Sequence, residues 1–374
     1  MSMDLEFLKK MCDTFGPSGH ETAVQKIVRD YGQQYADEIS YDRMGSVILK
    51  KGSDGPKIMM AGHGDEIGFV IKEIDDNGFL KISNLGGWWS QTLLTQEILI
   101  RPFKGGEDII GVIGAKPPHI LKAEERNKVV QMSDMFVDIG CASAEEVKAL
   151  GIRVGDPAVP LSFFRTEKRT RIEKKEGSEE KTKREVTIGV ARNFDNRIGV
   201  FIAVEALRRL KDEGVNHPNT IYSVSTTQEE VGLRGARTAA HVIQPDIGIA
   251  LDVDVSGDVP GASDLIQKMG KGVVISAGDS SMIPNPRLRK FAIEVAEEND
   301  IKWQDGFLTG GGTDAGIIHI TGAGAPSLFL GIATRHIHSH HAILDLDDVE
   351  NAIKLVVAMV KKLDKETVDS FTSL

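Results

Sequence analysis

Residues 220–232 read Thr-Ile-Tyr-Ser-Val-Ser-Thr-Thr-Gln-Glu-Glu-Val-Gly, a strand-like run that leads into two adjacent carboxylates and a glycine. The β-branched and aromatic residues of its first half predict a buried strand. Neighbouring side chains at the end of a strand point to opposite faces, so Glu229 and Glu230 would face different groups. One could bind a metal while the other faces a water molecule. A Glu-Glu pair alone is typical of a solvated surface, so the pair becomes a candidate site only when other ligands join it.

Strand-like runs alternate with amphipathic helical patterns along most of the chain. This rhythm predicts an α/β fold with a mainly parallel sheet flanked by helices. At the N-terminal end, Ser18-Gly-His-Glu21 has capping-box spacing and predicts a helix from there to about Ala36. The other predicted strands lie at 46–49, 57–61, 186–191, 246–252 and 326–330, and the other helices lie at 4–12, 197–211, 285–299 and 345–363.

Between residues 68 and 161 the pattern changes to short strands and turns. Phe69–Ile74 and Phe79–Ile82 flank Asp75-Asp-Asn-Gly78, which is a strong hairpin signal. We therefore predict a small β-rich domain, residues 68–161, inserted into a main domain formed by residues 1–67 and 162–374.

A charged run at 166–185 contains eight Lys or Arg and six Asp or Glu residues. Such a run predicts a solvated hairpin or a flexible loop. A lid or a subunit contact is the less favoured alternative.

Composition excludes several classes of protein. The net charge of -10 over 374 residues argues against nucleic-acid binding. No run approaches the roughly 20 apolar residues that span a bilayer, so no membrane partner is expected. The N-terminus lacks a signal-peptide pattern, and Cys12 and Cys141 are too few for a disulfide framework. These features predict a cytoplasmic protein.

Acidic and histidine side chains follow several predicted strands. In open α/β sheets, sites lie beyond the carboxyl ends of the strands. Each residue alone has a structural alternative; Asp195, for example, could be a plain helix N-cap. Together they would repel one another unless a cation compensates their charge. The residues are His63, Asp65, Asp195, Glu229, Glu230, Asp252 and His338.

Two histidines and three carboxylates suit divalent zinc, cobalt or manganese. They can hold two ions if one carboxylate bridges. The remaining Glu would then serve as a general base. Asp65 follows His63 by two residues and could accept the other ring N–H of that histidine.

These motifs resemble those of the tetrahedral-type (TET) dinuclear metalloaminopeptidases, metallopeptidase family 42, some of which carry the label endoglucanase. The resemblance covers essentially the whole chain. The stretches that carry it are 16–21, 62–68, 194–197, 227–232, 251–253, 312–315 and 335–339.

The resemblance implies a zinc-exopeptidase type of α/β fold, related to the phosphorylase/hydrolase-like folds, and assigns the residues. Asp195 would bridge two metals, and Glu229 would be the base. One metal site would be completed by His63 and Asp252, and the other by Glu230 and His338. The resemblance also implies a cis bond between Asp195 and Asn196.

For function, the resemblance implies removal of N-terminal residues from short peptides by a homo-oligomer, such as a dodecamer built from dimers through the inserted domain. A deacylase or other amide hydrolase with the same two-metal centre remains the alternative. A glycoside hydrolase is less favoured, because glycosidases need no metal for their chemistry. The side-chain preference, the metal, the oligomer size and any assistance from His336, His340 or His341 stay open.

Overall fold

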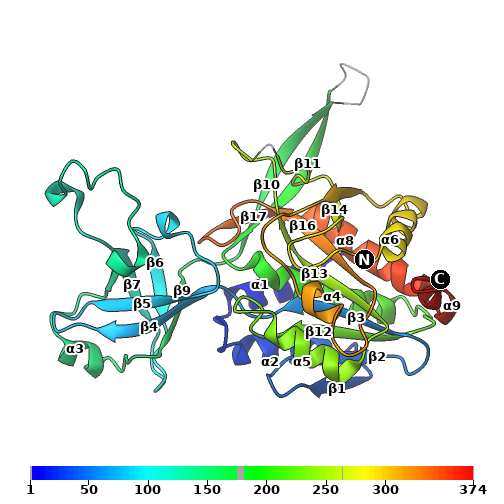
Figure 1. Ribbon diagram of the computed structural model, residues 1–374, viewed down its shortest axis with the longest axis horizontal. Helices are drawn as coiled ribbons and strands as arrows, with labels where there is room; N and C mark the ends of the chain where they lie inside the picture. The colour runs from blue at the N-terminus through cyan, green and yellow to red at the C-terminus, as the bar shows by residue number, and fades with distance from the viewer. Residues whose placement is uncertain (1, 175–180, 263, 374) are drawn as a thin grey trace.

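The computed structural model describes residues 2–174, 181–262 and 264–373, which form a main body, a barrel beside it and a projecting hairpin (Figure 1). The main body is built on an eight-stranded sheet of order β1-β2-β12-β3-β13-β16-β14-β15. Its strands are β1 (Glu38–Tyr41), β2 (Val47–Lys51), β3 (Lys57–His63), β12 (Thr220–Thr226), β13 (Ile247–Val255), β14 (Val273–Ser276), β15 (Trp303–Gly306) and β16 (Ser327–Thr334).

Helices cover both faces of this sheet. One face packs against the larger group of helices through apolar residues such as Phe201 and Val356, and the other packs against α5 and α7. The first group comprises α1 (Leu5–Asp13), α2 (Thr22–Gly32), α4 (Phe194–Asp212), α6 (Pro286–Glu298) and α8 (Leu346–Lys362); α5 is Arg234–Ile243, α7 is Ala315–Ile318, and α9 (Lys365–Ser370) ends the chain. None of the helices in the described ranges is long and apolar enough to cross a membrane.

The sheet is mixed, and the prediction of a mainly parallel sheet is confirmed only in part, at the four central strands and at the edge pair β14/β15. The strands β12, β3, β13 and β16 are parallel neighbours, which places Thr226 beside His63 and Asp252 beside Gly331. The pairs β1/β2, β2/β12 and β14/β16 are antiparallel. The run at 186–191 was expected in this sheet but belongs to β11, which pairs with β10 and β17 in a separate three-stranded sheet.

The capping box predicted at Ser18–Glu21 is wrong. The helix α2 begins at Thr22 without a side-chain cap. The Ser18 hydroxyl instead donates to Asp65, and the Glu21 carboxylate accepts from the backbone N–H groups of Gly19 and Gln228. The side chains of Ser18 and Glu21, which the sequence spacing had assigned to the helix N-terminus, therefore bind distant parts of the chain instead.

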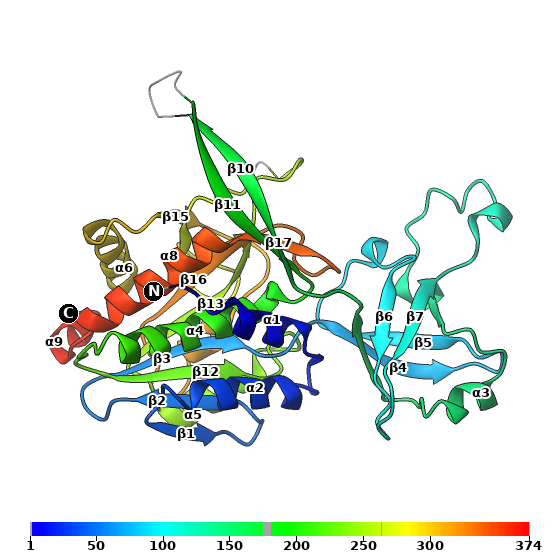
Figure 2. The same cartoon turned by 180° about the vertical axis from the view of Figure 1, so that it is seen from behind.

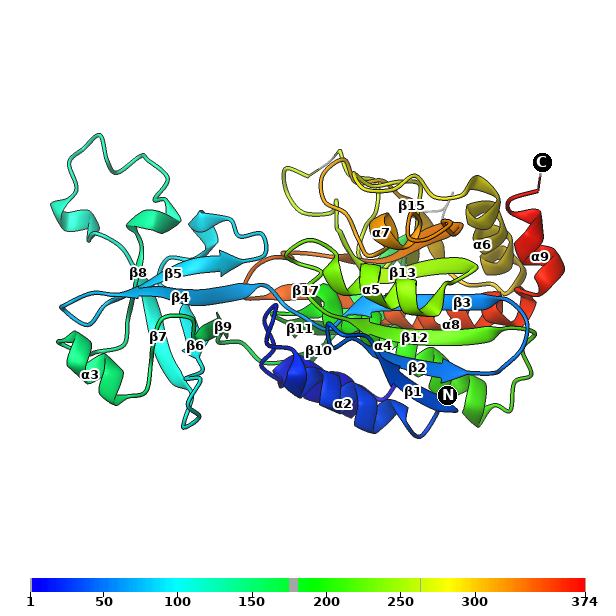
Figure 3. The ribbon, with the colours of Figure 1, turned by 60° about the horizontal axis from the view of Figure 1, so that its bottom comes forward.

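The β-rich segment forms a closed barrel of order β4-β5-β8-β7-β6-β9 that lies to one side of the main body (Figure 3). Its core is apolar and separate from the main core, with Phe69, Leu80 and Val137 fully buried. The boundaries that separate a domain at 68–161 from one at 1–67 plus 162–374 stay a prediction. The barrel strands are β4 (Gly68–Ile74), β5 (Leu80–Leu85), β6 (Glu97–Ile100), β7 (Ile109–Gly114), β8 (Phe136–Asp138) and β9 (Pro157–Pro160), with α3 (Ala144–Ala149) between β8 and β9.

The charged run forms a hairpin of β10 (Arg165–Lys174) and β11 (Lys181–Ala191) that projects from the main body (Figure 2). The hairpin prediction is confirmed, and residues 175–180 lie outside the described ranges. The hairpin is anchored to the main body, because Arg171 pairs with the buried Asp345 of β17 (Ala342–Asp345) at 2.8 Å. Arg184 likewise pairs with Asp347 at the start of α8.

A buried ion-pair network joins the end of β3 to the start of α4. Glu66 is 1% exposed and accepts from Arg192 Nε at 2.6 Å, Arg197 Nη2 at 3.2 Å and Asn193 Nδ2 at 3.1 Å. Its Oε1 also accepts from the backbone N–H of Gly16. Because these partners surround Asp195 in the sequence, the network fixes the backbone that carries Asp195.

Replacing Glu66 with Gln should lower the free energy of unfolding by about 3–5 kcal/mol, because two buried guanidinium groups would lose their anion. Urea denaturation at fixed protein concentration measures this change. Glu38→Gln removes an exposed partner of Lys50 and is the control, with an expected loss of at most about 1 kcal/mol. Equal losses in the two variants would contradict a stabilising role for the network.

Candidate metal centre

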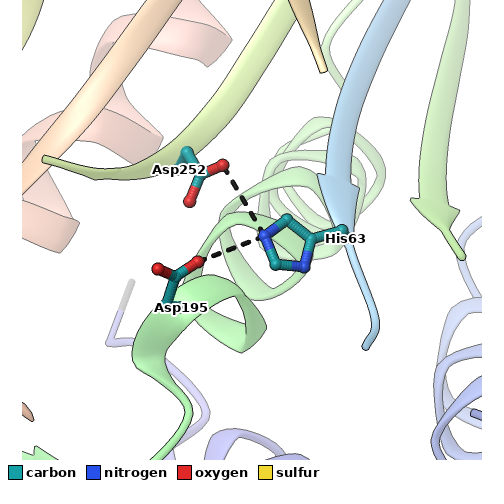
Figure 4. Close-up of side chains that lie close together, drawn as sticks. All are labelled: His63, Asp195 and Asp252. Carbon is teal, nitrogen blue, oxygen red and sulfur yellow. Dashed lines mark hydrogen bonds and ion pairs between the residues drawn. The ribbon is translucent and has the colours of Figure 1, made fainter. Parts of the chain in front are cut away.

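His63, Asp195 and Asp252 converge where the central strands end (Figure 4). His63 Nε2 lies 3.1 Å from Asp195 Oδ1 and 3.8 Å from Asp252 Oδ2. His63 is 1% exposed and Asp252 5% exposed, so this group is almost closed to solvent. The three ligand atoms could hold one metal ion.

A second group shares Asp195. Its Oδ2 lies 3.1 Å from His338 Nε2, and Glu230 Oε2 lies 3.5 Å from the same nitrogen. The two oxygens of Asp195 therefore face two different histidines. This arrangement is the one expected of a carboxylate that bridges two ions.

Each ligand comes from a different local structure. His63 is the last residue of β3, whereas Asp252 lies within β13, which continues to Val255. Asp195 sits in a non-helical kink at the start of α4, and the predicted cis bond between Asp195 and Asn196 is present. His338 follows β16 with a left-handed backbone, at φ 54°.

The strand alternation invoked for Glu229 and Glu230 is wrong, because β12 already ends at Thr226 and both residues lie in the following loop. Gln228 precedes them with φ 54°, which turns the chain. Glu229 Oε2 then lies 3.6 Å from His63 Nε2, while Glu230 faces His338. The two carboxylates do point to different groups, but the loop conformation is the cause.

Asp65 holds this loop. Its carboxylate is fully buried and accepts from the backbone N–H groups of Glu229 at 3.0 Å and Glu230 at 3.2 Å, and from the Ser18 hydroxyl at 2.6 Å. His63 Nδ1 lies 3.2 Å from the carbonyl oxygen of Asp65 and 3.4 Å from its Oδ1. Since a carbonyl only accepts, the ring proton belongs on Nδ1, which leaves Nε2 free for a metal.

The barrel contributes a contact that sequence reasoning missed. The carbonyl oxygen of Gly87, in the loop after β5, lies 2.6 Å from His338 Nδ1 and fixes the tautomer of that histidine. A Cβ on Gly86 would lie 3.0 Å from Glu230 Oε2, and one on Gly87 would lie 3.2 Å from His338 Nδ1. The Gly86-Gly87 pair was the available sequence signal, since close backbone approach favours glycine.

The other nearby histidines belong to neither ligand group found in the described residues. His341 Nδ1 contacts the Ser162 hydroxyl at 3.0 Å. His340 is buried with its ring centroid 5.9 Å from that of Trp88, and His336 is exposed.

Burial and like charge shift the pKa values of the site. Burial raises the pKa of Glu230 to about 8, and the charge of Asp195 adds to the effect. Burial likewise raises the pKa of Asp252 well above its ordinary value. Burial alone would lower the pKa of His338, but Asp195 and Glu230 raise it to about 10. These shifts favour the protonated forms of the groups, and divalent cations would displace such protons on binding.

The residues present therefore fit two divalent ions. The donor set is imidazole nitrogen and carboxylate oxygen, and Glu230 Oε1 is buried without a hydrogen-bond partner. The centre opens into a cavity of about 650 Å³ that is large enough for an amino-acid residue.

Comparison with known proteins identifies the family. Residues 45–355 match the family model described as M42 glutamyl aminopeptidase. The chain belongs to the M42 peptidase family. Its structure is similar to that of the TET aminopeptidase from a marine sediment archaeon of the Thaumarchaeota, with 48% identity, a TM-score of 0.91, and coverage of 98% of this chain and 99% of that one.

Two further relatives extend this likeness. The M42 peptidase described here is 34% identical to the lysyl aminopeptidase of Pyrococcus furiosus over 96% of this chain and 98% of that protein. It also resembles the TET1 peptidase of Pyrococcus horikoshii, a protein that can assemble into a tetrahedron or a large octahedral shell. That likeness has 30% identity and a TM-score of 0.79, and it covers 96% of this chain and 99% of that one.

In this M42 peptidase, His338→Ala should weaken binding of one ion only, whereas Asp195→Ala should weaken binding of both. The reason is that Asp195 alone belongs to both ligand groups. Elemental analysis of dialysed protein, together with calorimetric titration, counts the ions per chain. The exposed His241 provides a control, since His241→Ala should bind the same number of ions, with the same affinity, as the unmodified protein. Loss of both ions from His338→Ala would contradict two separate groups.

Proposed function

We propose that this M42 aminopeptidase removes N-terminal residues from short peptides at a centre that binds two divalent ions. The observation that carries the proposal is the shared Asp195, whose two oxygens face His63 and His338 separately. In this proposal His63 and Asp252 complete one metal site, and Glu230 and His338 complete the other. Zinc, cobalt and manganese all suit these ligands.

When bound, divalent ions supply Lewis-acid polarisation of the scissile carbonyl and lower the pKa of water. The chain itself supplies the proton transfer. Glu229 lines the cavity and, at 9% exposure, is shielded from bulk solvent. We assign it as the base that takes a proton from the attacking water and passes it to the leaving amine.

The electrostatics support this role for Glu229. Burial raises its pKa well above the ordinary value, and the negative charges of Glu230, Asp314 and Asp252 contribute. Neutralising the charges of Glu230 and Asp252 would lower the pKa of Glu229 and so favour the deprotonated form that a base requires. Asp65 acts as a positioning residue, because it binds the backbone N–H groups of Glu229 and Glu230.

A deacylase would use the same centre and differ only in the substrate it accepts. A panel of free aminoacyl, N-acetylated and blocked peptides separates these activities. Cleavage restricted to N-blocked substrates would contradict an aminopeptidase. Activity on cellulose-type substrates that survives chelation would instead support a glycoside hydrolase.

Glu229→Gln should lower kcat by at least about 10²-fold, because the amide cannot accept the proton. The variant should still bind two ions per chain, since Glu229 is in neither ligand group. Steady-state hydrolysis of aminoacyl anilides by the zinc-, cobalt- or manganese-loaded protein measures kcat.

Gln228→Glu, one residue earlier in the same loop, is the control, and it should retain kcat because the Gln228 side chain accepts from Arg234 Nη1 at 3.0 Å and is not among the described residues that line the cavity. Full activity of Glu229→Gln would reject Glu229 as the base. Loss of the ions from that variant would show instead that Glu229 is a ligand.

We also propose that the chain forms a homo-oligomer such as a dodecamer, in which the barrel at 68–161 joins subunits into dimers. Apolar side chains on the outside of the barrel support this. Ile110 and Val112 of β7 are 52% and 42% exposed, whereas Ile113 of the same strand is fully buried. Phe103 is 71% exposed on the same barrel.

The double variant Ile110→Lys, Val112→Lys should form smaller assemblies, because charge replaces the apolar surface available for contact. Light scattering coupled to size-exclusion chromatography gives the mass. Ile172→Lys on the hairpin is the matched control, since Ile172 is 60% exposed but lies outside the barrel. Dissociation caused by Ile172→Lys alone would assign subunit contact to the hairpin instead.

A further inference from the structure

The cavity beside the metal centre extends to two more carboxylates, Asp254 and Asp279. Asp254 lies two residues beyond Asp252 on β13, so both side chains are on the same face of the sheet. Asp279 follows β14. Neither residue belongs to the two ligand groups found in the described part of the chain.

Each carboxylate is oriented by one oxygen and leaves the other unpartnered. Asp254 is 2% exposed, and its Oδ1 accepts from Gln267 Nε2 at 3.0 Å. Asp279 is 8% exposed, and its Oδ1 accepts from Ser281 Oγ and the N–H groups of Ser281 and Met282 at 2.7–2.8 Å. The Oδ2 atom of both residues is buried without a hydrogen-bond partner.

Space is left around Asp254 by glycines of β15 and β16. A Cβ on Gly306 would lie 2.9 Å from Asp254 Oδ2, and one on Gly331 would lie 3.0 Å from Asp254 Cβ. A side chain at either position would therefore crowd the carboxylate.

Among the described residues, no lysine or arginine pairs with either of these carboxylates. In the described ranges, neither Asp254 nor Asp279 has a Lys or Arg within ion-pair distance, and the described residues that line the cavity include no Lys or Arg. An unpaired buried carboxylate is unfavourable, so this end of the cavity is suited to a positive group. Leu308 and Phe329 add apolar surface to the lining, which suits a methylene stem.

We propose that the cavity takes a peptide whose N-terminal residue is lysine or arginine, with its cationic end bound by Asp254 and Asp279. This inference rests on the proposed aminopeptidase function and names its substrate class. The stem packs against Leu308 and Phe329. An acidic side chain would add a further negative charge, and an apolar one would leave both carboxylates without a partner.

The test compares lysine with norleucine, which has the same unbranched stem without the ammonium group. The metal-loaded protein is assayed with the lysine, norleucine and glutamate p-nitroanilides. We expect kcat/KM for lysine to exceed that for norleucine by at least about tenfold, from hydrogen bonds to a charged group. Glutamate should be the poorest of the three.

Asp254→Asn and Asp279→Asn should each reduce the lysine-to-norleucine ratio, while norleucine hydrolysis is retained as evidence of folding. Asn keeps an acceptor oxygen, so the contacts with Gln267, Ser281 and Met282 can persist. Asp246→Asn is the control, because Asp246 is exposed just before the opposite end of β13. The lysine-to-norleucine ratio of Asp246→Asn should equal that of the unmodified protein.

If Asp254→Asn and Asp279→Asn fail to fold, a binding measurement tests the inference without them. Calorimetric titration of metal-loaded Glu229→Gln with lysinamide and norleucinamide should show tighter binding of lysinamide, by at least about tenfold. Equal binding, or an unchanged ratio in folded Asn variants, would overturn the inference, as would a preference for norleucine or glutamate. Cleavage of none of the anilides would reject the proposed function instead, and the titration would still decide this inference.

Discussion

Repulsion between buried carboxylates is the constraint on which this structure depends. Asp195, Glu230 and Asp252 are brought together around two histidines in a place where water solvates them poorly. Such a cluster is unfavourable unless opposite charge enters it. Burial and the charge of Asp195 raise the pKa values of Glu230 and Asp252, so a bound proton is favoured there unless a cation replaces it. Metal binding and stability of the site are therefore linked.

The segment His63–Glu66 answers this constraint by fixing both sides of the cluster. His63 supplies a candidate ligand, and Asp65 binds the loop that carries Glu229 and Glu230. Glu66 accepts from Arg192 and Arg197, which flank Asp195. The consecutive carboxylates Asp65 and Glu66 thus fix two distant parts of the chain, the Glu229 loop and the start of α4, relative to the end of β3. Displacement of this segment would move all of these groups together.

The candidate site could be predicted from the sequence more completely than the fold around it. His63, Asp195 and Asp252 were grouped from residue type and from the family resemblance, and the structure brings them together. Their placement differs from the prediction, because Asp252 lies within β13 and Asp195 follows a strand of the separate three-stranded sheet. The loop conformation of Glu229 could not be predicted, because it depends on a left-handed Gln228 and on long-range bonds to Asp65. The antiparallel edge strand β1, with few buried residues, and the placement of β11 also escaped prediction, since local patterns do not specify strand partners.

The barrel and the metal centre are mechanically connected through one loop. The Gly87 carbonyl orients His338, and Gly86 lies against Glu230. The geometry of the ligand group that contains Glu230 and His338 therefore depends on the position of the barrel. In the other ligand group, His63 and Asp252 lie on strands of the main sheet. A rotation of the barrel relative to the main body would therefore disturb one ligand group and spare the other. Because the barrel is also the proposed subunit contact, assembly would restrict that rotation and stabilise the geometry around His338.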